Sequence, residues 1–103
     1  MKKRRPSYDL QELKELLTKE ETREVMQRDR QEAVRLGYAD EEEMVKRALK
    51  LRPEEFDKTM PSDRFSNLMQ DVYFTYDKTK KLYIKLQKSF NGKAIIISFK
   101  ETR

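Results

Sequence analysis

Basic and aromatic side chains alternate with apolar ones toward the end of the chain, at spacings that could bring them together on a phosphate. Tyr83 and Lys85 are two residues apart, and so are Ser98 and Lys100. Residues two apart on a β-strand point to the same face of the sheet. Lysines attract phosphate groups, and aromatic rings stack on nucleobases. The pattern therefore indicates a sheet face that holds RNA.

The chain contains no histidine and no cysteine. Histidine is the commonest general base and metal ligand, and cysteine is the other frequent ligand of structural metals. Disulfides and cysteine-bound metals are therefore excluded, and we expect neither a metal nor a cofactor. Any catalysis has to use lysine, tyrosine, glutamine or carboxylate side chains.

Charge is distributed unevenly along the chain, whose net charge is +5. Residues 2–5 are all basic, residues 7–71 hold 12 basic and 17 acidic side chains, and residues 72–103 hold 8 basic and 2 acidic ones. A basic segment attracts a phosphate backbone by releasing bound counterions. The alternative interpretation is that these lysines only solubilise an exposed sheet face.

Three segments, 72–76, 82–87 and 94–99, have the composition and alternation of β-strands. Asn91-Gly92 predicts a two-residue type I′ turn between the last two. The register that follows pairs residues across this hairpin: Tyr83 with Lys100, Lys85 with Ser98, and Gln87 with Ile96. The opposite side of the hairpin is predicted to face the core: Ile84, Leu86, Ile95, Ile97 and Phe99.

The strand at 72–76 joins the hairpin through residues 77–80. A loop of two or four residues pairs Phe74 with Tyr83, whereas a loop of three or five would turn that strand over. With the first register, one polar face collects seven side chains: Gln70, Phe74, Tyr83, Lys85, Gln87, Ser98 and Lys100. We call this set the polar face.

Helices are predicted in the first half of the chain. Three pairs fit the capping box that starts a helix: Asp9 with Glu12, Thr18 with Glu21, and Asp40 with Glu43. The second helix would end at Gly37, although Val25 and Met26 could instead form a short strand.

Two further short helical turns are predicted between the third helix and the strands. Pro53 favours a short helix that carries Phe56 toward Lys58 and stops before Pro61. Ser62 or Asp63 would cap another turn that runs to Met69. Residues 1–103 are thus expected to form one α+β domain, with helices packed on one face of an antiparallel sheet.

No apolar run approaches the length of a membrane span, and residues 1–6 lack the apolar stretch of a signal peptide. A soluble cytoplasmic protein is therefore expected.

Several motifs resemble one family over nearly the whole chain. They are Met-Gln-Asp-Val-Tyr at 69–73, Leu-Tyr-Ile-Lys at 82–85 and Ile-Ile-Ser-Phe-Lys-Glu at 96–101, with Lys3-Arg4, Pro6, Leu36-Gly37 and Phe56-x-Lys58-x-Met60 before them. In order and spacing these motifs resemble the motility quorum-sensing regulator (MqsR) family of mRNA interferase toxins.

The resemblance implies a RelE-like toxin fold and the toxin role in a type II toxin–antitoxin system. Such a toxin inhibits translation as an endoribonuclease that cuts mRNA at short GC-containing sites without the ribosome. Its partners are mRNA and a cognate antitoxin protein, and it meets DNA only through the toxin–antitoxin complex. The implied catalytic residues are Lys58, Gln70 and Tyr83. Met60 and Lys100 also match the family, and with Phe74 and Lys85 they complete the expected RNA-binding set.

The chain departs from the family pattern at three positions. Ser7 stands where the family has a histidine, Asp57 where it has a tyrosine, and Phe74 where it has an arginine. These differences concern substrate preference and leave the central lysine, glutamine and tyrosine in place.

The expected reaction is attack of a ribose 2′-hydroxyl on the adjacent phosphate, which leaves a 2′,3′-cyclic phosphate and a 5′-hydroxyl. Lys58 would stabilise the phosphorane charge and Tyr83 would donate a hydrogen bond or a proton. Gln70 would orient the RNA, and Lys100 would favour ionisation of Tyr83. Two alternatives remain: a module that binds single-stranded RNA without cutting it, and a protein-interaction domain with an acidic partner.

Overall fold

The computed structural model describes residues 5–65 and 67–102. Over these residues the chain forms three α-helices, two 3₁₀ turns and five strands: α1 (Leu10–Leu17), η1 (Glu20–Thr22), β1 (Arg23–Val25), α2 (Arg30–Arg35), α3 (Glu41–Ala48), η2 (Pro53–Glu55), β2 (Phe56–Pro61), β3 (Met69–Asp77), β4 (Lys80–Lys88) and β5 (Ala94–Glu101).

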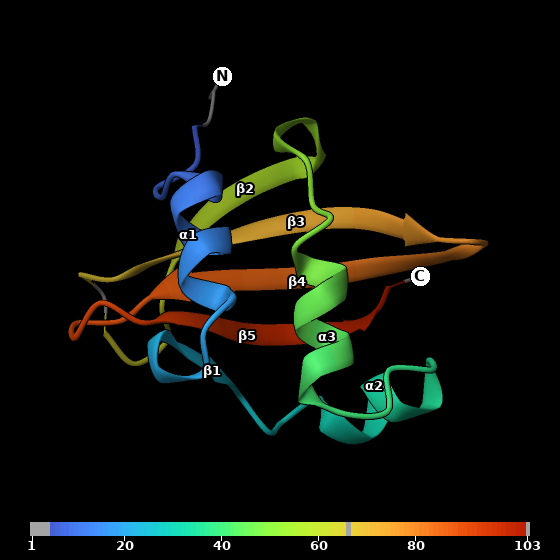
Figure 1. Cartoon of the computed structure of the whole chain (residues 1–103). Helices are drawn as coiled ribbons and strands as arrows, with labels where there is room; N and C mark the ends of the chain where they lie inside the picture. The colour runs from blue at the N-terminus through green and yellow to red at the C-terminus, as the bar shows by residue number, and fades with distance from the viewer. Residues whose placement is uncertain (1–4, 66, 103) are drawn as a thin grey trace.

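The strands form one sheet in the order β1-β5-β4-β3-β2. Neighbouring strands are antiparallel except β1, which runs parallel to β5. Figure 1 shows both α1 and α3 in front of one face of this sheet, with α2 below β5. The predicted α+β fold with helices on one face of an antiparallel sheet is therefore confirmed.

The core lies between the sheet and the two covering helices. Leu10, Leu13 and Leu17 form one buried stripe along α1, because their spacing follows the helical repeat. Buried Met44, Val45 and Ala48 do the same along α3. These side chains belong to one apolar cluster with sheet residues that face the helices: Tyr73, Leu82, Ile84, Leu86, Ile96 and Phe99.

The chain before α1 is tied to the sheet by a buried carboxylate. Asp71 is fully buried, and its two oxygens accept hydrogen bonds of 3.0 Å from the backbone N–H groups of Ser7 and Tyr8. The Tyr8 hydroxyl donates to the carbonyl oxygen of Met69 at 2.6 Å. Because a buried carboxylate is stable only when it is hydrogen-bonded, Asp71 makes this attachment obligatory.

The helix starts were predicted with mixed success. The Asp40 carboxylate accepts a hydrogen bond from the N–H of Glu43 at 3.0 Å, which confirms that cap. Thr18 instead ends α1 and is followed only by η1, so the start signal at Thr18 was wrong. The short-strand alternative was right at Val25, which lies in β1.

The predicted short helix that leads to Lys58 was wrong. Pro53 starts only η2, and the chain then extends as β2, which pairs with β3. Packing explains the difference: the Phe56 ring lies edge-on to that of Tyr73, 5.7 Å between centroids. The predicted turn after Ser62 is not helical over its described residues, where the Ser62 hydroxyl accepts hydrogen bonds from the N–H groups of Arg64 and Phe65.

The β4–β5 turn also differs from the expected type I′ geometry. The loop has three residues, Phe90 to Gly92, because the Ser89 N–H donates to the Lys93 carbonyl at 2.8 Å. Gly92 has a φ of +84°, whereas Asn91 is not among the described residues with positive φ. A β-bulge between Lys85 and Leu86 then restores the predicted register farther along.

The longer loop and the bulge change which isoleucines face the core. Tyr83 pairs with Lys100 as predicted, but Gln87 pairs with Ile95 and not with Ile96. Ile96 lies in the core cluster, while Ile95 and Ile97 lie outside it. The core prediction was therefore wrong for Ile95 and Ile97, which join the polar face.

Candidate functional site

The polar face lies on the side of the sheet opposite the helices, and β2 extends it. Residues that pair directly across antiparallel strands share a face. Lys58 pairs with Val72, and Met60 pairs with Gln70. The structure thus places all the predicted site residues on one face: Lys58, Met60, Gln70, Phe74, Tyr83, Lys85 and Lys100.

Aromatic rings and lysines form a contiguous cluster at the centre of the polar face. The rings of Phe74 and Tyr83 lie edge to face, with centroids 5.6 Å apart at 70°. The Lys81 Nζ is 4.7 Å from the Phe74 ring centroid. The Nζ atoms of Lys100 and Lys85 lie 5.2 and 5.9 Å from that of Tyr83. These cation–π contacts hold ammonium groups beside rings on which a base can stack.

Lys85 is the most constrained of these cations. It is only 9% exposed. Burial first, and then the positive charges of Arg28, Lys100 and Lys58, lower the pKa of Lys85, while Asp63 opposes the shift. Positive charge is therefore concentrated here, and a phosphate would relieve the repulsion.

Tyr83 keeps its proton at neutral pH. Burial raises the pKa of Tyr83, Arg28 opposes the shift, and the carboxylates of Asp57 and Asp29 add to it. We expected Lys100 to favour ionisation of this hydroxyl, but the net shift runs the other way. Tyr83 is therefore suited to donate a hydrogen bond or a proton.

Two glutamines adjoin the cluster. The Gln70 Nε2 donates to the Gln87 Oε1 at 2.8 Å, and the two side chains are 7% and 6% exposed. This contact confirms the strand register that brought Gln70 to the polar face. It also holds both amides in a fixed orientation.

Arg28, Asp29 and Asp63 were missed by the sequence reasoning. Asp29 anchors the segment before α2, because its Oδ2 accepts a hydrogen bond from the Phe99 N–H at 2.9 Å. That anchor brings Arg28 toward the polar face. No local pattern marks these residues: Arg28 and Asp29 follow β1, whose position depends on its pairing with β5, and Asp63 lies in the connection between β2 and β3.

Of the three departures from the family pattern, Ser7 does not contribute its side chain to the polar face. The Ser7 Oγ lies 2.7 Å from the Thr59 Oγ1, and Thr59 pairs with Asp71 on the helix side of the sheet. Asp57 lies at the register irregularity between Phe56 and Lys58, and its carboxylate contributes to the raised pKa of Tyr83. Phe74, the third departure, lies within the aromatic cluster.

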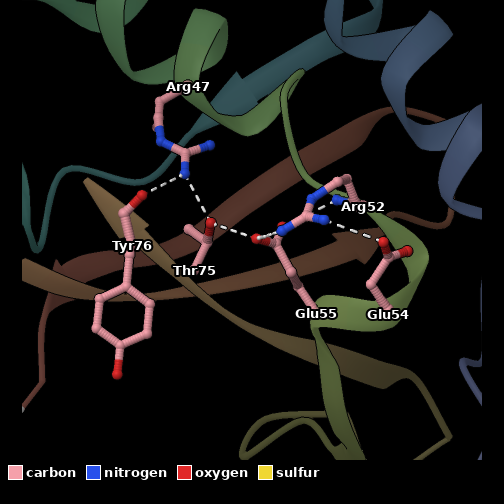
Figure 2. A network of polar contacts seen from close by, with 6 residues as sticks. All are labelled: Arg47, Arg52, Glu54, Glu55, Thr75 and Tyr76. Atoms are coloured by element: carbon pink, nitrogen blue, oxygen red, sulfur yellow. Dashed lines mark hydrogen bonds and ion pairs between the residues drawn. The ribbon is translucent and has the colours of Figure 1, made fainter. Parts of the chain in front are cut away.

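Away from the polar face, a pocket of about 750 Å³ lies between α3, η2 and the end of β3. Figure 2 shows the polar network beside it. The Arg47 Nη2 donates to the Thr75 Oγ1 at 2.6 Å and to the Tyr76 carbonyl at 3.0 Å, and the Thr75 hydroxyl donates to Glu55 at 2.7 Å. These groups bind one another and tie α3 and η2 to β3, which is a structural role.

Within residues 5–65 and 67–102, no helix has the length and apolar character needed to cross a membrane.

The fold and a family comparison together define the class: the chain is a toxin of a toxin–antitoxin system. Residues 5–101 match the family described as "Motility quorum-sensing regulator, toxin of MqsA", and the chain belongs to that family. The family implies an antitoxin partner. No curated protein matches the chain in sequence.

Proposed function

We propose that this toxin is an endoribonuclease that cuts mRNA in the cytoplasm at short GC-containing sites, without the ribosome and without a metal. The observation that carries the proposal is the convergence of Lys58, Gln70, Tyr83, Lys85 and Lys100 on one sheet face. They come from four strands, and basic and proton-donating groups together fit the demands of phosphoryl transfer.

In the proposed reaction the ribose 2′-oxygen forms a bond to the adjacent phosphorus, and the bond from phosphorus to the 5′-oxygen breaks. The 2′-hydroxyl proton passes to water. Lys58, which is exposed, stabilises the added negative charge with Lys85. Tyr83 gives its proton to the leaving 5′-oxygen. Gln70 orients the strand, while Phe74, Met60 and Lys100 hold the flanking nucleotides.

Purified toxin incubated with end-labelled mRNA tests this directly. We expect fragments with 5′-hydroxyl and 2′,3′-cyclic phosphate ends, in the absence of ribosomes and in the presence of EDTA. Retention of intact RNA would favour the alternative of a binding module. Absence of RNA affinity even at low salt, where phosphate contacts are strongest, would favour a pure protein-interaction domain.

Lys58→Ala tests the central residue of the proposal. Loss of one preorganised charge should lower the cleavage rate by roughly 10²–10³-fold. Folding should be unchanged, because Lys58 is exposed on an edge strand. Lys19→Ala, another exposed lysine but outside the polar face, is the matched control and should cut at the wild-type rate. Equal cleavage rates for the two variants would show that Lys58 is not a catalytic residue.

The antitoxin part of the proposal has its own test. We propose that a cognate antitoxin protein neutralises the toxin, and that contact with operator DNA occurs only through their complex. Expression of the toxin alone should arrest growth, and co-expression of the antitoxin should relieve the arrest. Operator DNA should be retained by the complex and not by the isolated toxin.

A further inference from the structure

A small pocket opens on the polar face beside the catalytic residues proposed above. Its volume is about 170 Å³, and Gln70, Gln87, Ile95 and Ile97 are among the residues that line it. We call it the amide pocket. A water molecule occupies ~30 Å³ in the liquid, so the space suits a small organic group better than a single solvent molecule.

The two glutamines present a defined hydrogen-bonding edge. Their mutual hydrogen bond uses one N–H of Gln70 and the oxygen of Gln87. Within the described part of the chain, the Gln70 Oε1 and the Gln87 Nε2 make no hydrogen bond. They are also not among the described polar atoms that are both buried and unpaired. The hydrogen-bonded amide pair therefore offers a ligand both an acceptor and a donor, the two kinds of group that the Watson–Crick edge of a nucleobase pairs with.

The apolar part of the pocket wall results from the three-residue loop between β4 and β5, while Arg28, Asp63 and Arg64 also line the pocket. A two-residue loop would have turned Ile95 and Ile97 toward the core, whereas the three-residue loop pairs Gln87 with Ile95, and both isoleucines flank the amides. Met26 and Phe65 also line the pocket and are 40% and 47% exposed. Phe65 stacks edge to face on Phe90, with centroids 5.5 Å apart. Exposed apolar rings beside a polar edge suit a flat aromatic ligand.

The pocket lies next to the lysines of the polar face, because residues that line it or pair with its lining are two positions from Lys85 and Lys58. Gln87 is two residues from Lys85 on β4, a separation of roughly 6.6 Å along a strand. Met60, which pairs with Gln70, is likewise two residues from Lys58. A base in the pocket would therefore belong to a nucleotide whose phosphate reaches the lysines.

We propose that the amide pocket binds one unstacked nucleobase beside the scissile phosphate, and that Gln87 determines which base is accepted. This inference rests on the proposed ribonuclease function and names the residues that give it sequence preference. The wrong base would leave the buried amides unpaired, and such mismatches discriminate more strongly than shape does.

The test uses four pentanucleotides of a single base each, all with 2′-O-methyl riboses that cannot attack the phosphate. Binding is measured by fluorescence anisotropy, so it does not depend on cleavage. Wild-type toxin should prefer one base by roughly 5- to 100-fold. Gln87→Leu, which keeps similar volume without hydrogen bonds, should abolish that preference. Gln11→Leu, an exposed change on α1, should retain it.

A second variant, Phe65→Ala, keeps the test decisive if Gln87→Leu does not fold. Circular dichroism checks each protein, and if Gln87→Leu does not fold, Phe65→Ala decides the question. Phe65 is 47% exposed, so its removal should leave the fold intact and weaken binding of the preferred pentanucleotide by about 5- to 100-fold. Unchanged binding by Phe65→Ala would then overturn the proposal.

The outcomes separate this inference from the proposed function. A folded Gln87→Leu protein with wild-type base preference overturns the pocket, even where cleavage is normal. A wild-type protein with no base preference does the same. If Gln87→Leu weakens only antitoxin binding, the pocket is part of a protein interface and the proposal fails. Base preference without any cleavage would support nucleobase binding in the amide pocket and would contradict the proposed ribonuclease function.

Discussion

At the scale of single residues, the environment of Tyr83 separates its ring from its hydroxyl. The ring packs on Phe74 and lies beside two lysines, while the raised pKa keeps the hydroxyl protonated. A single side chain can thus help to hold the sheet face together and also supply a proton. The two contributions can be tested separately, because phenylalanine retains the ring.

Tyr83→Phe should therefore lower RNA cleavage by about 10²–10³-fold while it leaves stability nearly unchanged. The measurement is the single-turnover rate on a short RNA, together with a urea unfolding curve. Tyr76→Phe is the control, because Tyr76 is 62% exposed and its hydroxyl has no role in the proposed reaction. A Tyr83→Phe protein that cuts at the wild-type rate would show that this hydroxyl is not the proton donor.

Lys85 illustrates a conflict between stability and binding. Its lowered pKa means that the fold disfavours its charged form. An unfolded lysine binds its proton more tightly, so stability should rise with pH between the folded pKa and the ordinary value of 10.5.

Lys85→Met should accordingly stabilise the protein at pH 7, by about 0.5–2 kcal/mol, and should weaken RNA binding. Chemical denaturation and anisotropy titrations measure the two effects. The stability gain should shrink as pH approaches 10, because wild-type Lys85 then loses its charge. Loss of stability at pH 7 would contradict the account of Lys85 as a strained cation.

At the scale of secondary-structure elements, β2 and β3 each contribute side chains to the polar face and to the helix side of the sheet. Lys58 and Met60 project to the polar face, while Thr59 between them lies on the helix side, opposite Asp71. The Asp71 carboxylate in turn holds the segment that precedes α1. The position of Lys58 thus depends indirectly on the attachment of the N-terminal segment.

Asp71→Asn tests this dependence. An amide offers one acceptor oxygen where the carboxylate offers two, so one N–H of Ser7 or Tyr8 loses its partner, at a cost of about 1–3 kcal/mol. Hydrogen exchange at these two backbone positions should accelerate more than at β5. Asp40→Asn, at the N-terminus of α3, is the matched control and should leave them protected. Unchanged protection in Asp71→Asn would show that Asp71 does not hold the segment before α1.

At the scale of the whole molecule, the network in Figure 2 joins α3 and η2 to the sheet away from the polar face. Burial opposes ionisation of Glu55, but hydrogen bonds from Thr75 and Arg52 outweigh it, and the pKa of Glu55 is lowered. A carboxyl whose pKa is lowered in the folded state stabilises the fold above its ordinary pKa. That stabilisation is lost as pH falls through the folded value.

Glu55→Gln should therefore cost about 1–3 kcal/mol at pH 7. The difference in unfolding free energy between this variant and wild type should begin to narrow below pH 4.5, the ordinary pKa of glutamate. It should vanish once Glu55 is protonated in the folded protein. Urea unfolding of both proteins at pH 7 and at low pH measures it. Glu54→Gln, at a neighbouring carboxylate that is 66% exposed, should change stability little at either pH. A difference that persists unchanged at low pH would show that charge is not the cause.

The sequence by itself determined the centre of the polar face. Strand alternation and a short hairpin predicted that Phe74 pairs with Tyr83 and Tyr83 with Lys100, and both pairs are present. The Phe74–Tyr83 pair follows from a two-residue connection between neighbouring strands, whereas the Tyr83–Lys100 pair also requires the bulge that restores the register after the three-residue loop. The family motifs at Lys58 and Gln70 likewise identified residues that the structure brings to the same face.

Only the tertiary structure decided how the rest of the polar face is built. Lys58 lies on an edge strand because β3 offers unpaired backbone groups and Phe56 packs on Tyr73, neither of which is visible in residues 53–61. A loop one residue longer than expected turns Ile95 and Ile97 outward, and the bulge then restores the register that pairs Tyr83 with Lys100. Arg28 arrives with β1, a strand paired across more than 60 residues of chain. Contacts between distant segments fix these positions, so no local pattern encodes them.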